Sequence, residues 1–379
     1  MPAPKINFPC IGHNSGYELR VEDFTAGTIS GQPVRRQLSL GGQWDARVHE
    51  LVREFGVEHS PELIEEMIVT ALGMARDKMS VADLKLISRS MKEMRYGAKI
   101  FANYQAFRKV AVFGSARAAE DSAESKAAEE FGRQMVAHNF MIITGGGDGI
   151  MGAAQRGAGR DMSFGLNIRL PFEQRANQTI DGDKKLINFN YFFDRKLNFV
   201  KETHALAFFP GGFGTLDEAF EILTLMQTGK ARIIPVVLLD RPDGNYWETW
   251  MTFITQNLYK IGFISEDDFC FFKILHEVRA AVEEITGFYR IYHSARWVGE
   301  KLVIRMERTL SPAGVAELND KFADVLRRGW IVQGTALPQE QNEPEIRMLP
   351  RLVLTPHRRS FGRFRQLIDA INRTEPAAD

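Results

Sequence analysis

The segment FFPGGFGTLDE, Phe208 to Glu218, places three glycines, a threonine and two carboxylates directly after an apolar run. Glycines let a backbone approach an anion closely, and a threonine hydroxyl can add a hydrogen bond. We therefore predict a phosphate-binding loop formed by Gly211, Gly212, Gly214 and Thr215. A bound phosphate repels a carboxylate, so a carboxylate beside this loop is costly unless it has a task. One of the two carboxylates that follow the loop, Asp217 or Glu218, is therefore a candidate for catalysis.

The helix after the loop is expected to begin near Leu216, with Thr215 as its cap and with Asp217 and Glu218 in its first turn. Carboxylates in a first turn also complement the helix dipole, so a purely structural role for both stays open. Upstream, the segment DRKLNFVKE brings Arg195 and Lys196 between two apolar runs. Such a pair commonly forms a solvated surface, but at the mouth of an anion site it could bind or polarise a ligand.

Two further glycine turns follow apolar runs, FGSAR at 113–117 and TGGGDGIMG at 144–152. In an open α/β sheet, ligands bind beyond the carboxyl ends of the strands, where helix N-termini present free N–H groups. We predict that all three turns contact one phosphate-bearing ligand. The additional contacts are expected from Gly114, Ser115, Gly146 and Gly147.

Gly147, Gly149 and Gly152 also match the G-x-G-x-x-G dinucleotide fingerprint, with Glu173 at a suitable distance for a ribose contact. The context fits poorly, because a strand and a helix precede this turn and Glu173 follows Pro171 beyond its strand. A nicotinamide cofactor is thus a weaker alternative, and glycines that serve only close helix–sheet packing are another. No glycine loop ends in Gly-Lys-Ser/Thr, which excludes a Walker loop.

The elements that must position these turns lie between Lys109 and about Phe288, where short apolar runs alternate with amphipathic segments. The runs are 109–114, 139–144, 163–168, 186–193, 204–209 and 233–240. Strands that are apolar on both faces and alternate with helices indicate a parallel sheet covered on both sides. We predict an α/β fold with a Rossmann-like, doubly wound parallel sheet in a domain at 106–288.

The flanks are predicted to form an N-terminal arm with a helical extension, 1–105, and a small α+β domain, 289–379. Residues 1 to about 45 lack periodicity, a helix should follow the Ser60 cap with Pro61 at its first position, and another should cover Val81 to Tyr104. The C-terminal order predicted is a strand, a helix opened by Ser311 and Pro312, two strands and a helix. The strands are expected at 297–306, 330–336 and 351–354, with 338–345 as an exposed loop and the last helix ending near Asn372.

The amino-acid composition limits the kinds of partner that the protein is expected to bind. Lys plus Arg equals Asp plus Glu at 48 each, so no global field attracts nucleic acid or an anionic membrane. Cys10 and Cys270 have no metal-ligand spacing and fit a reducing compartment. The longest apolar stretch, 233–239, is far shorter than the ~20 residues of a spanning helix. The N-terminus lacks a signal-peptide pattern, so we expect a cytoplasmic protein with no nucleic-acid or membrane partner.

The combination of RK at 195–196, PGGFGTLDE at 210–218 and GGGDGIM at 145–151 resembles the Lonely guy (LOG) family of nucleoside 5'-monophosphate phosphoribohydrolases. The resemblance covers about Lys109 to Glu284, and the flanks resemble long bacterial members in layout. It implies a Rossmann-like homodimer or higher assembly, without metal or organic cofactor, that hydrolyses AMP or related nucleotides to free base and ribose 5-phosphate.

By this resemblance, Arg195 and Glu218 match the catalytic Arg and Glu of the family, and the PGGFGT segment matches its phosphate loop. Many members carry Glu where Gly152 stands here, although plant-type members also have Gly. The resemblance predicts that Glu218 activates water and stabilises an oxocarbenium-like sugar while Arg195 holds phosphate or ribose. Lys196 and Asp217 are weaker candidates.

Two questions stay open at the level of sequence. A protein of the same fold could bind a nucleotide or the molybdenum cofactor without hydrolysis, although the presence of both Arg195 and Glu218 favours an enzyme. The C-terminal stretch TPHRRSFGRFR, 355–365, forms either a solvated surface or interface rim, or an anionic effector site. Its cationic residues are Arg358, Arg359, Arg363 and Arg365.

Overall fold

The computed structural model describes residues 28–29, 32–33, 39–170, 175–340, 343–359 and 361–377. Contacts divide the chain into two compact units, one of which is Tyr17–Arg95 and the other of which contains Tyr96–Asp379. Cys10 and Glu173, which entered the sequence argument, lie outside the described residues. The domain boundaries predicted at residues 106 and 289 stay a prediction.

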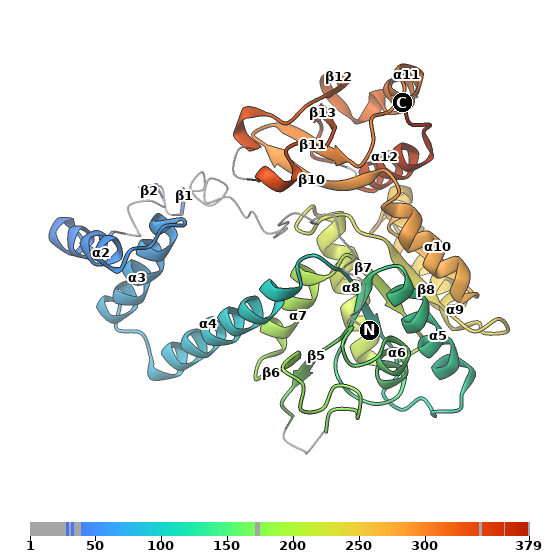
Figure 1. Cartoon of the computed structure of the whole chain (residues 1–379), viewed down its shortest axis with the longest axis horizontal. Coiled ribbons are helices and arrows are strands. Elements are labelled where there is room, and N and C mark those ends of the chain that lie inside the picture. Colours follow the sequence, from blue (N-terminus) through green and yellow to red (C-terminus); the bar gives the residue numbers. More distant parts are fainter. Residues whose placement is uncertain are drawn as a thin grey trace, which may run out of the picture. The chain divides into compact units, whose positions relative to one another are not determined.

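The unit Tyr17–Arg95 is built mainly of helices, drawn in blue in Figure 1. It contains the short pair β1 (Thr28–Ile29) and β2 (Gln32–Pro33), the helices α2 (Gly42–Phe55) and α3 (Pro61–Arg76), and most of α4 (Val81–Phe101). Pro61 begins α3 as predicted, since its fixed φ suits a first helical position. The predicted Ser60 cap is wrong, because Ser60 has a left-handed φ of 47° and its side chain makes no capping hydrogen bond.

A seven-stranded parallel sheet forms the centre of the larger unit, and it confirms the predicted α/β class (Figure 1). The strand order is β6-β5-β4-β3-β7-β8-β9. The strands are β3 (Arg108–Phe113), β4 (Phe140–Thr144), β5 (Ser163–Ile168), β6 (Leu186–Phe189), β7 (Ala205–Phe208), β8 (Val236–Leu239) and β9 (Phe272–Leu275). Sequence reasoning missed β9, because this edge strand follows directly on a 3-10 turn, Glu266–Phe271.

Helices cover both faces of this sheet. The helices are α5 (Ala123–Ala137), α6 (Ile150–Ala158), α7 (Phe192–Glu202), α8 (Phe213–Gln227), α9 (Tyr246–Ile254) and α10 (Val278–Phe288). Alternate residues of β3 enter two separate cores: Val110 and Val112 pack with α5, α6 and α10, whereas Ala111 and Phe113 pack with α7, α8 and α9. This alternation is what a doubly wound sheet requires. The run predicted as a strand to 193 ends earlier, because α7 begins at Phe192.

The C-terminal part of the larger unit is a four-stranded antiparallel sheet of order β10-β11-β13-β12 with two helices. Its elements are β10 (Tyr292–Val298), β11 (Lys301–Met306), α11 (Pro312–Lys321), β12 (Leu326–Gly334), β13 (Arg351–Pro356) and α12 (Phe361–Arg373). Ser311 caps α11 by accepting a hydrogen bond from the Gly314 N–H at 3.1 Å, as expected of a helix opened by Ser311 and Pro312. The single strand predicted at 297–306 is wrong: Val298 pairs with Lys301 across a two-residue turn in which Gly299 adopts φ 61°.

Residues 338–345 do not form the predicted exposed loop throughout. Glu340 is buried and lies between Arg305 and Arg351, neither of which is exposed to solvent. Its carboxylate oxygens are 2.9 Å from Nη2 of Arg305 and 3.2 Å from Nε of Arg351. A charged glutamate can be buried here because two guanidinium groups compensate it.

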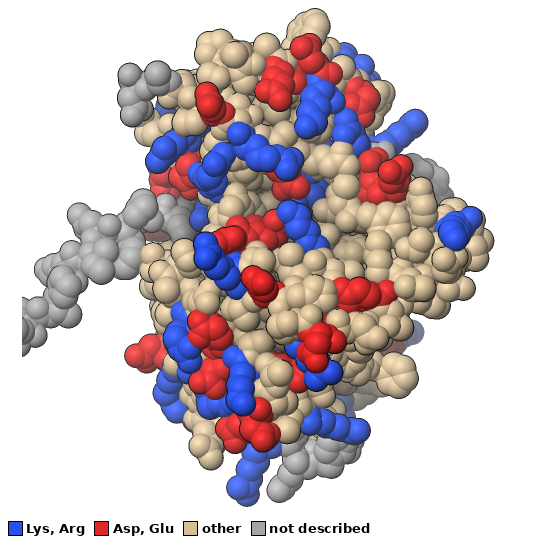
Figure 2. All heavy atoms as spheres, turned by 90° about the vertical axis from the view of Figure 1, so that its right-hand side faces the viewer, with Lys and Arg blue, Asp and Glu red and all other residues tan. Residues whose placement is uncertain are grey.

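The surface carries charged side chains of both signs (Figure 2), and no described helix is both long and strongly apolar. Figure 2 shows a face on which Lys and Arg side chains are interspersed with Asp and Glu. In the described ranges, no helix combines the length and the apolar character needed to cross a membrane.

Candidate active site

Two of the three predicted glycine turns follow strands at the point where the order of the sheet reverses, and the third follows the neighbouring strand β4. From β3 the chain adds β4, β5 and β6 on one side, and then returns to place β7, β8 and β9 on the other. The turn at Gly114 follows β3 and the PGG turn follows β7, so both lie at this reversal. In open α/β sheets this is the place where ligands bind.

The turns also contact one another through backbone atoms. The Ser115 N–H donates to the carbonyl of Pro210 at 3.0 Å, and the Ile150 N–H donates to the carbonyl of Ser115 at 3.1 Å. A Cβ at Gly149 would lie 2.3 Å from the Ser115 oxygen, which explains why this left-handed position is a glycine. The structure therefore brings together the three turns that the sequence predicted to share a ligand.

Gly146 and Gly147 are held by a side chain that sequence reasoning missed. The Nδ2 atom of Asn177, which is buried, donates to the carbonyls of Gly146 and Gly147 at 3.0 and 2.9 Å and to Oε1 of Gln155 at 2.6 Å. Asn177 lies in an irregular segment, so no periodicity marked it. It fixes the shape of the glycine turn after β4.

The start of α8 differs from the prediction. The helix begins at Phe213 with Gly212 at the N-cap, so Thr215 lies inside the helix and does not cap it. No acidic residue occupies the first turn, which means that Glu218 is further from the helix N-terminus than expected. Because the dipole effect fades beyond the first turn, the purely structural explanation for Glu218 loses its basis. Gly212 and Gly214 face open space, where a Cβ would meet nothing within 4 Å.

Arg195 of α7 and Glu218 of α8 meet beside these turns. Nη2 of Arg195 is 3.5 Å from Oε1 of Glu218, and the Glu218 side chain is only 5% exposed. A Cβ at Gly145 would lie 3.8 Å from Nη1 of Arg195, so the guanidinium also adjoins the turn after β4. Within the described residues, Oε1 of Glu218 and Nε of Arg195 have no hydrogen-bond partner. Two buried charged groups with unused hydrogen-bonding capacity are typical of a ligand site.

Burial controls the protonation of this pair. It raises the pKa of Glu218 to about 7, because it outweighs the nearby cations Lys196 and Arg195. Burial likewise lowers the pKa of Arg195 from its usual value, against the pull of Glu218. The aromatic rings of Phe192 and Phe199 lie 5.0 and 5.8 Å from the guanidinium carbon and orient it.

Lys196 contacts carboxylates other than that of Glu218. Its Nζ lies 2.7 Å from Oδ2 of Asp217 and 2.6 Å from Oε2 of Glu221, and so joins α7 to α8. Although burial opposes it, these two hydrogen bonds raise the pKa of Lys196. Lys196 remains charged and adds positive potential beside Glu218.

A second residue that the sequence did not reveal supports the loop after β7. The Tyr246 hydroxyl, at the start of α9, donates to the carbonyl of Gly211 at 2.7 Å. A Cβ at Gly211 would overlap with Oγ1 of Thr215 at 2.1 Å and would lie 3.1 Å from the carbonyl carbon of Gly114. The loop conformation is therefore set by packing and by one hydrogen bond from a distant helix.

Comparison with known proteins agrees with this geometry. A family model described as "Possible lysine decarboxylase" matches residues 151–285. A cytokinin riboside 5'-monophosphate phosphoribohydrolase of Arabidopsis thaliana is 29% identical over 163 residues, which are 42% of this chain and 73% of the relative. The predicted resemblance to the Lonely guy family is confirmed.

A probable cytokinin riboside 5'-monophosphate phosphoribohydrolase of Oryza sativa subsp. japonica is 31% identical over 164 residues, which are 42% of this chain and 63% of the relative. Among solved structures, the molybdenum cofactor carrier protein of Chlamydomonas reinhardtii shares 22% identity with a TM-score of 0.33, covering 48% of this chain and 96% of that one. Each of these matches covers less than half of this chain.

Proposed function

We propose that the protein hydrolyses the N-glycosidic bond of nucleoside 5'-monophosphates, such as AMP or related purine and cytokinin nucleotides, to free base and ribose 5-phosphate. The observation that carries this proposal is the Arg195–Glu218 pair, largely removed from solvent, beside glycine turns that follow β3, β4 and β7. The relatives named phosphoribohydrolases support it.

The chemistry that we propose centres on Glu218. In this proposal its carboxylate stabilises positive charge on the sugar as the bond from C1' to the base weakens, and it accepts a proton from the attacking water. Water oxygen forms the new bond to C1', and the electron pair of the broken bond leaves with the base nitrogen. The proton held by Glu218 then neutralises the departing base. A pKa of about 7 suits a group that must gain and lose a proton at neutral pH.

Arg195 and the glycine turns would bind the phosphate and ribose. The exposed backbone at Gly212 and Gly214, where no side chain obstructs an anion, is the phosphate cradle in this proposal, and Tyr246 holds its shape through Gly211. Gly114, Ser115, Gly146, Gly147, Lys196 and Thr215 stay candidates for further contacts or for charge near the ligand. Phosphate binding supplies energy that orients the sugar for attack. We propose that no metal or organic cofactor takes part.

We also propose that the protein forms a homodimer or a higher homo-oligomer in the cytoplasm. Helices α7 and α8, which carry Arg195 and Glu218, expose large apolar side chains next to the site, including Phe213 at 94% exposure. The others are Phe192, Phe193, Leu197 and Phe220. Clustered apolar exposure of this kind marks a contact surface. Light scattering of the purified chain should give a mass at least twice that of the monomer, and a monomer at micromolar concentration would contradict the proposal.

A substrate panel tests the proposed activity. AMP should release adenine, whereas adenosine, which lacks the phosphate, should react at a small fraction of the rate because the sugar is no longer oriented. Released base is measured by chromatography. Equal turnover of AMP and adenosine would refute the phosphate cradle. Tight AMP binding without any base release would instead favour the non-hydrolytic alternative, a nucleotide or molybdenum-cofactor binding protein.

A further inference from the structure

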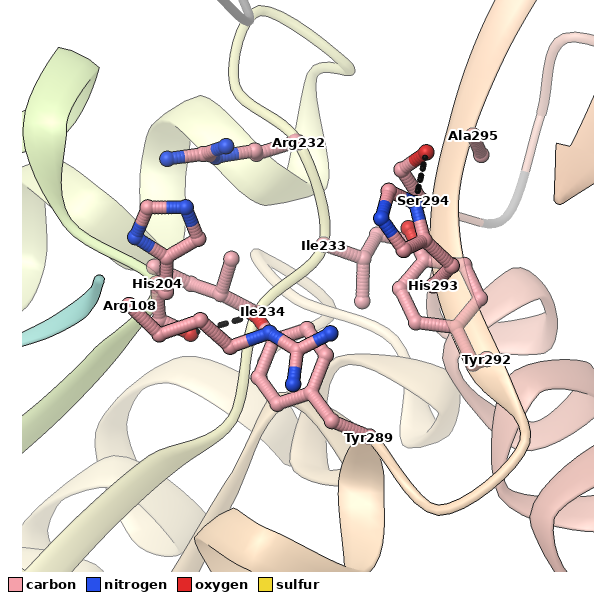
Figure 3. A pocket seen from close by; sticks show the side chains of 10 residues that line it. All are labelled: Arg108, His204, Arg232, Ile233, Ile234, Tyr289, Tyr292, His293, Ser294 and Ala295. Atoms are coloured by element: carbon pink, nitrogen blue, oxygen red, sulfur yellow. Dashed lines mark hydrogen bonds between the residues drawn. The ribbon is translucent and has the colours of Figure 1, made fainter. Parts of the chain in front are cut away.

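A polar cavity lies near the amino ends of strands β3, β7 and β8 (Figure 3). Its volume is about 60 Å³, enough for several water molecules or a small oxyanion. One wall carries Arg108, His204 and Arg232, and the other carries Tyr289, His293 and Ser294 from the segment that enters the C-terminal sheet. β3 alone separates Arg108 from Gly114 by about 20 Å at ~3.3 Å per residue, so this cavity is distinct from the candidate active site.

The cations of the cavity are poorly compensated. Arg232 uses Nη2 to donate to the carbonyls of Lys201 and Thr203 at 3.2 and 2.6 Å, and no carboxylate pairs with it among the residues that the structure describes. Arg108 lies over the ring of Tyr289, 4.2 Å from its centroid, and 3.5 Å from a carboxylate oxygen of Glu307. Glu307 is 39% exposed, so solvent weakens its effect on the cavity.

The pKa values of the two histidines in the cavity reflect burial and the positive electrostatic potential of the nearby cations. Burial lowers the pKa of His204 well below its usual value, and every charged neighbour that adds to this effect is a base: Arg232, Lys109, Arg108 and His293. Burial also lowers the pKa of His293 to about 4, again assisted only by arginines. Both imidazoles are therefore neutral at pH 7 and each retains one N–H donor. A buried cavity with this arrangement attracts an anion.

We propose that this cavity binds a phosphate group, held by Arg108 and Arg232 with hydrogen bonds from the imidazole and hydroxyl groups that line it. Guanidinium groups suit phosphate because they can donate two parallel hydrogen bonds to its oxygens. The ligand is either inorganic phosphate or the phosphate of a phosphomonoester whose remaining part extends towards solvent. The site is independent of the proposed hydrolysis, because it uses none of the same residues.

Calorimetric titration of the full chain with inorganic phosphate tests this proposal. Arg108→Gln and Arg232→Gln should each weaken binding by about 10- to 100-fold, the range expected for one lost charge-assisted hydrogen bond. The control Arg279→Gln, at an arginine 82% exposed on α10, should bind as wild type does. Arg195→Gln removes a cation of the candidate active site, and should leave the cavity's phosphate affinity unchanged. Parallel titration with ribose 5-phosphate identifies which of the two sources binds more tightly.

A second variant guards against misfolding, since Arg232 also holds the carbonyls at the end of α7. Ser294→Asp places a carboxylate in the cavity and leaves Arg108 and Arg232 in place. It should abolish phosphate binding at the cavity and melt no lower than wild type in phosphate-free buffer, because it neutralises the same arginines. Wild-type phosphate affinity in Ser294→Asp and in both arginine variants would overturn the proposal, as would phosphate binding that only Arg195→Gln removes.

Discussion

Two glutamates in the described part of the chain, Glu340 and Glu218, are buried beside arginines and behave in opposite ways. Glu340 receives hydrogen bonds from the Leu337 N–H, from Arg305 and from Arg351, and despite burial these lower its pKa. Glu218 has one arginine at 3.5 Å and an oxygen without a hydrogen bond, and burial raises its pKa to about 7. The same residue types thus form a cluster whose carboxylate accepts several hydrogen bonds in one place, and a pair whose carboxylate keeps an oxygen without a hydrogen bond in the other.

The largest expected difference between the two glutamates is in their effect on the turnover of AMP. Glu218→Gln keeps the shape of the side chain but removes the base, so AMP hydrolysis should fall by ~10² to 10⁴ while AMP still binds, because a charge that repels phosphate is gone. Adenine release and AMP calorimetry measure this. Glu283→Gln, which alters an exposed carboxylate on α10, is the control. Normal turnover in Glu218→Gln would exclude it as the base.

The structural pair should respond through stability. Glu340→Gln leaves Arg351 without its compensating charge and leaves Arg305 paired only with Glu343, which should lower the free energy of unfolding by about 3 kcal/mol. Urea unfolding gives the difference. At a temperature where the variant is folded, its turnover of AMP should stay within a few-fold of wild type. Loss of turnover greater than loss of folded protein would mean that the C-terminal sheet contributes to catalysis.

The pH dependence of the two pairs should have opposite signs. Glu218 keeps its proton in the folded state up to about pH 7, but loses it near 4.5 when unfolded, so its contribution to stability falls as pH rises between these values. The stability of Glu218→Gln relative to wild type should therefore increase from pH 5 to pH 8. Glu340 has a lowered pKa, so its stabilisation is present at neutral pH and is lost on acidification.

The pH dependence of activity supplies a second test of the raised pKa of Glu218. The proposed base must be ionised, so kcat/KM for AMP should rise with pH through about 7. Melting temperatures of wild type and both glutamine variants, recorded across this range, check the stability signs. Parallel curves for wild type and Glu218→Gln would show that Glu218 titrates normally.

The smallest effect on catalysis should come from a change at Tyr246, which supports the loop after β7 from a neighbouring helix. Tyr246→Phe removes the hydrogen bond to the Gly211 carbonyl, which is worth about 1 kcal/mol, and should lower kcat/KM for AMP by several-fold. Phe253→Leu on the same helix alters an exposed side chain and serves as the control. A Tyr246→Phe protein with wild-type kinetics would show that packing alone holds the loop.

The arginines of 355–365, for which the sequence left a solvated surface and an anionic effector site as alternatives, have separate partners in the structure. Arg365 is 1% exposed and pairs with Glu284 and Asp369, Arg363 pairs with Asp324, and Arg358 lies over Trp297. The expectation of a wholly solvated surface is wrong for Arg365, whose aliphatic stem and charge are both taken into the core. The cationic cavity instead comes from Arg108 and Arg232, which are 124 positions apart and carry no shared motif.

The sequence by itself determined what local chemistry can specify. Apolar runs alternating with helices are enough for a parallel sheet, and glycine turns after strands must meet at one edge because parallel strands all end there. These patterns, together with the motifs that resemble a known family, placed Arg195, Glu218 and three glycine turns at one site. Tertiary structure decided the rest: where α8 begins, that Asn177 and Tyr246 support the turns, and that burial raises the pKa of Glu218 while hydrogen bonds lower that of Glu340. These properties depend on solvent exclusion and on contacts between distant segments, which no local pattern records.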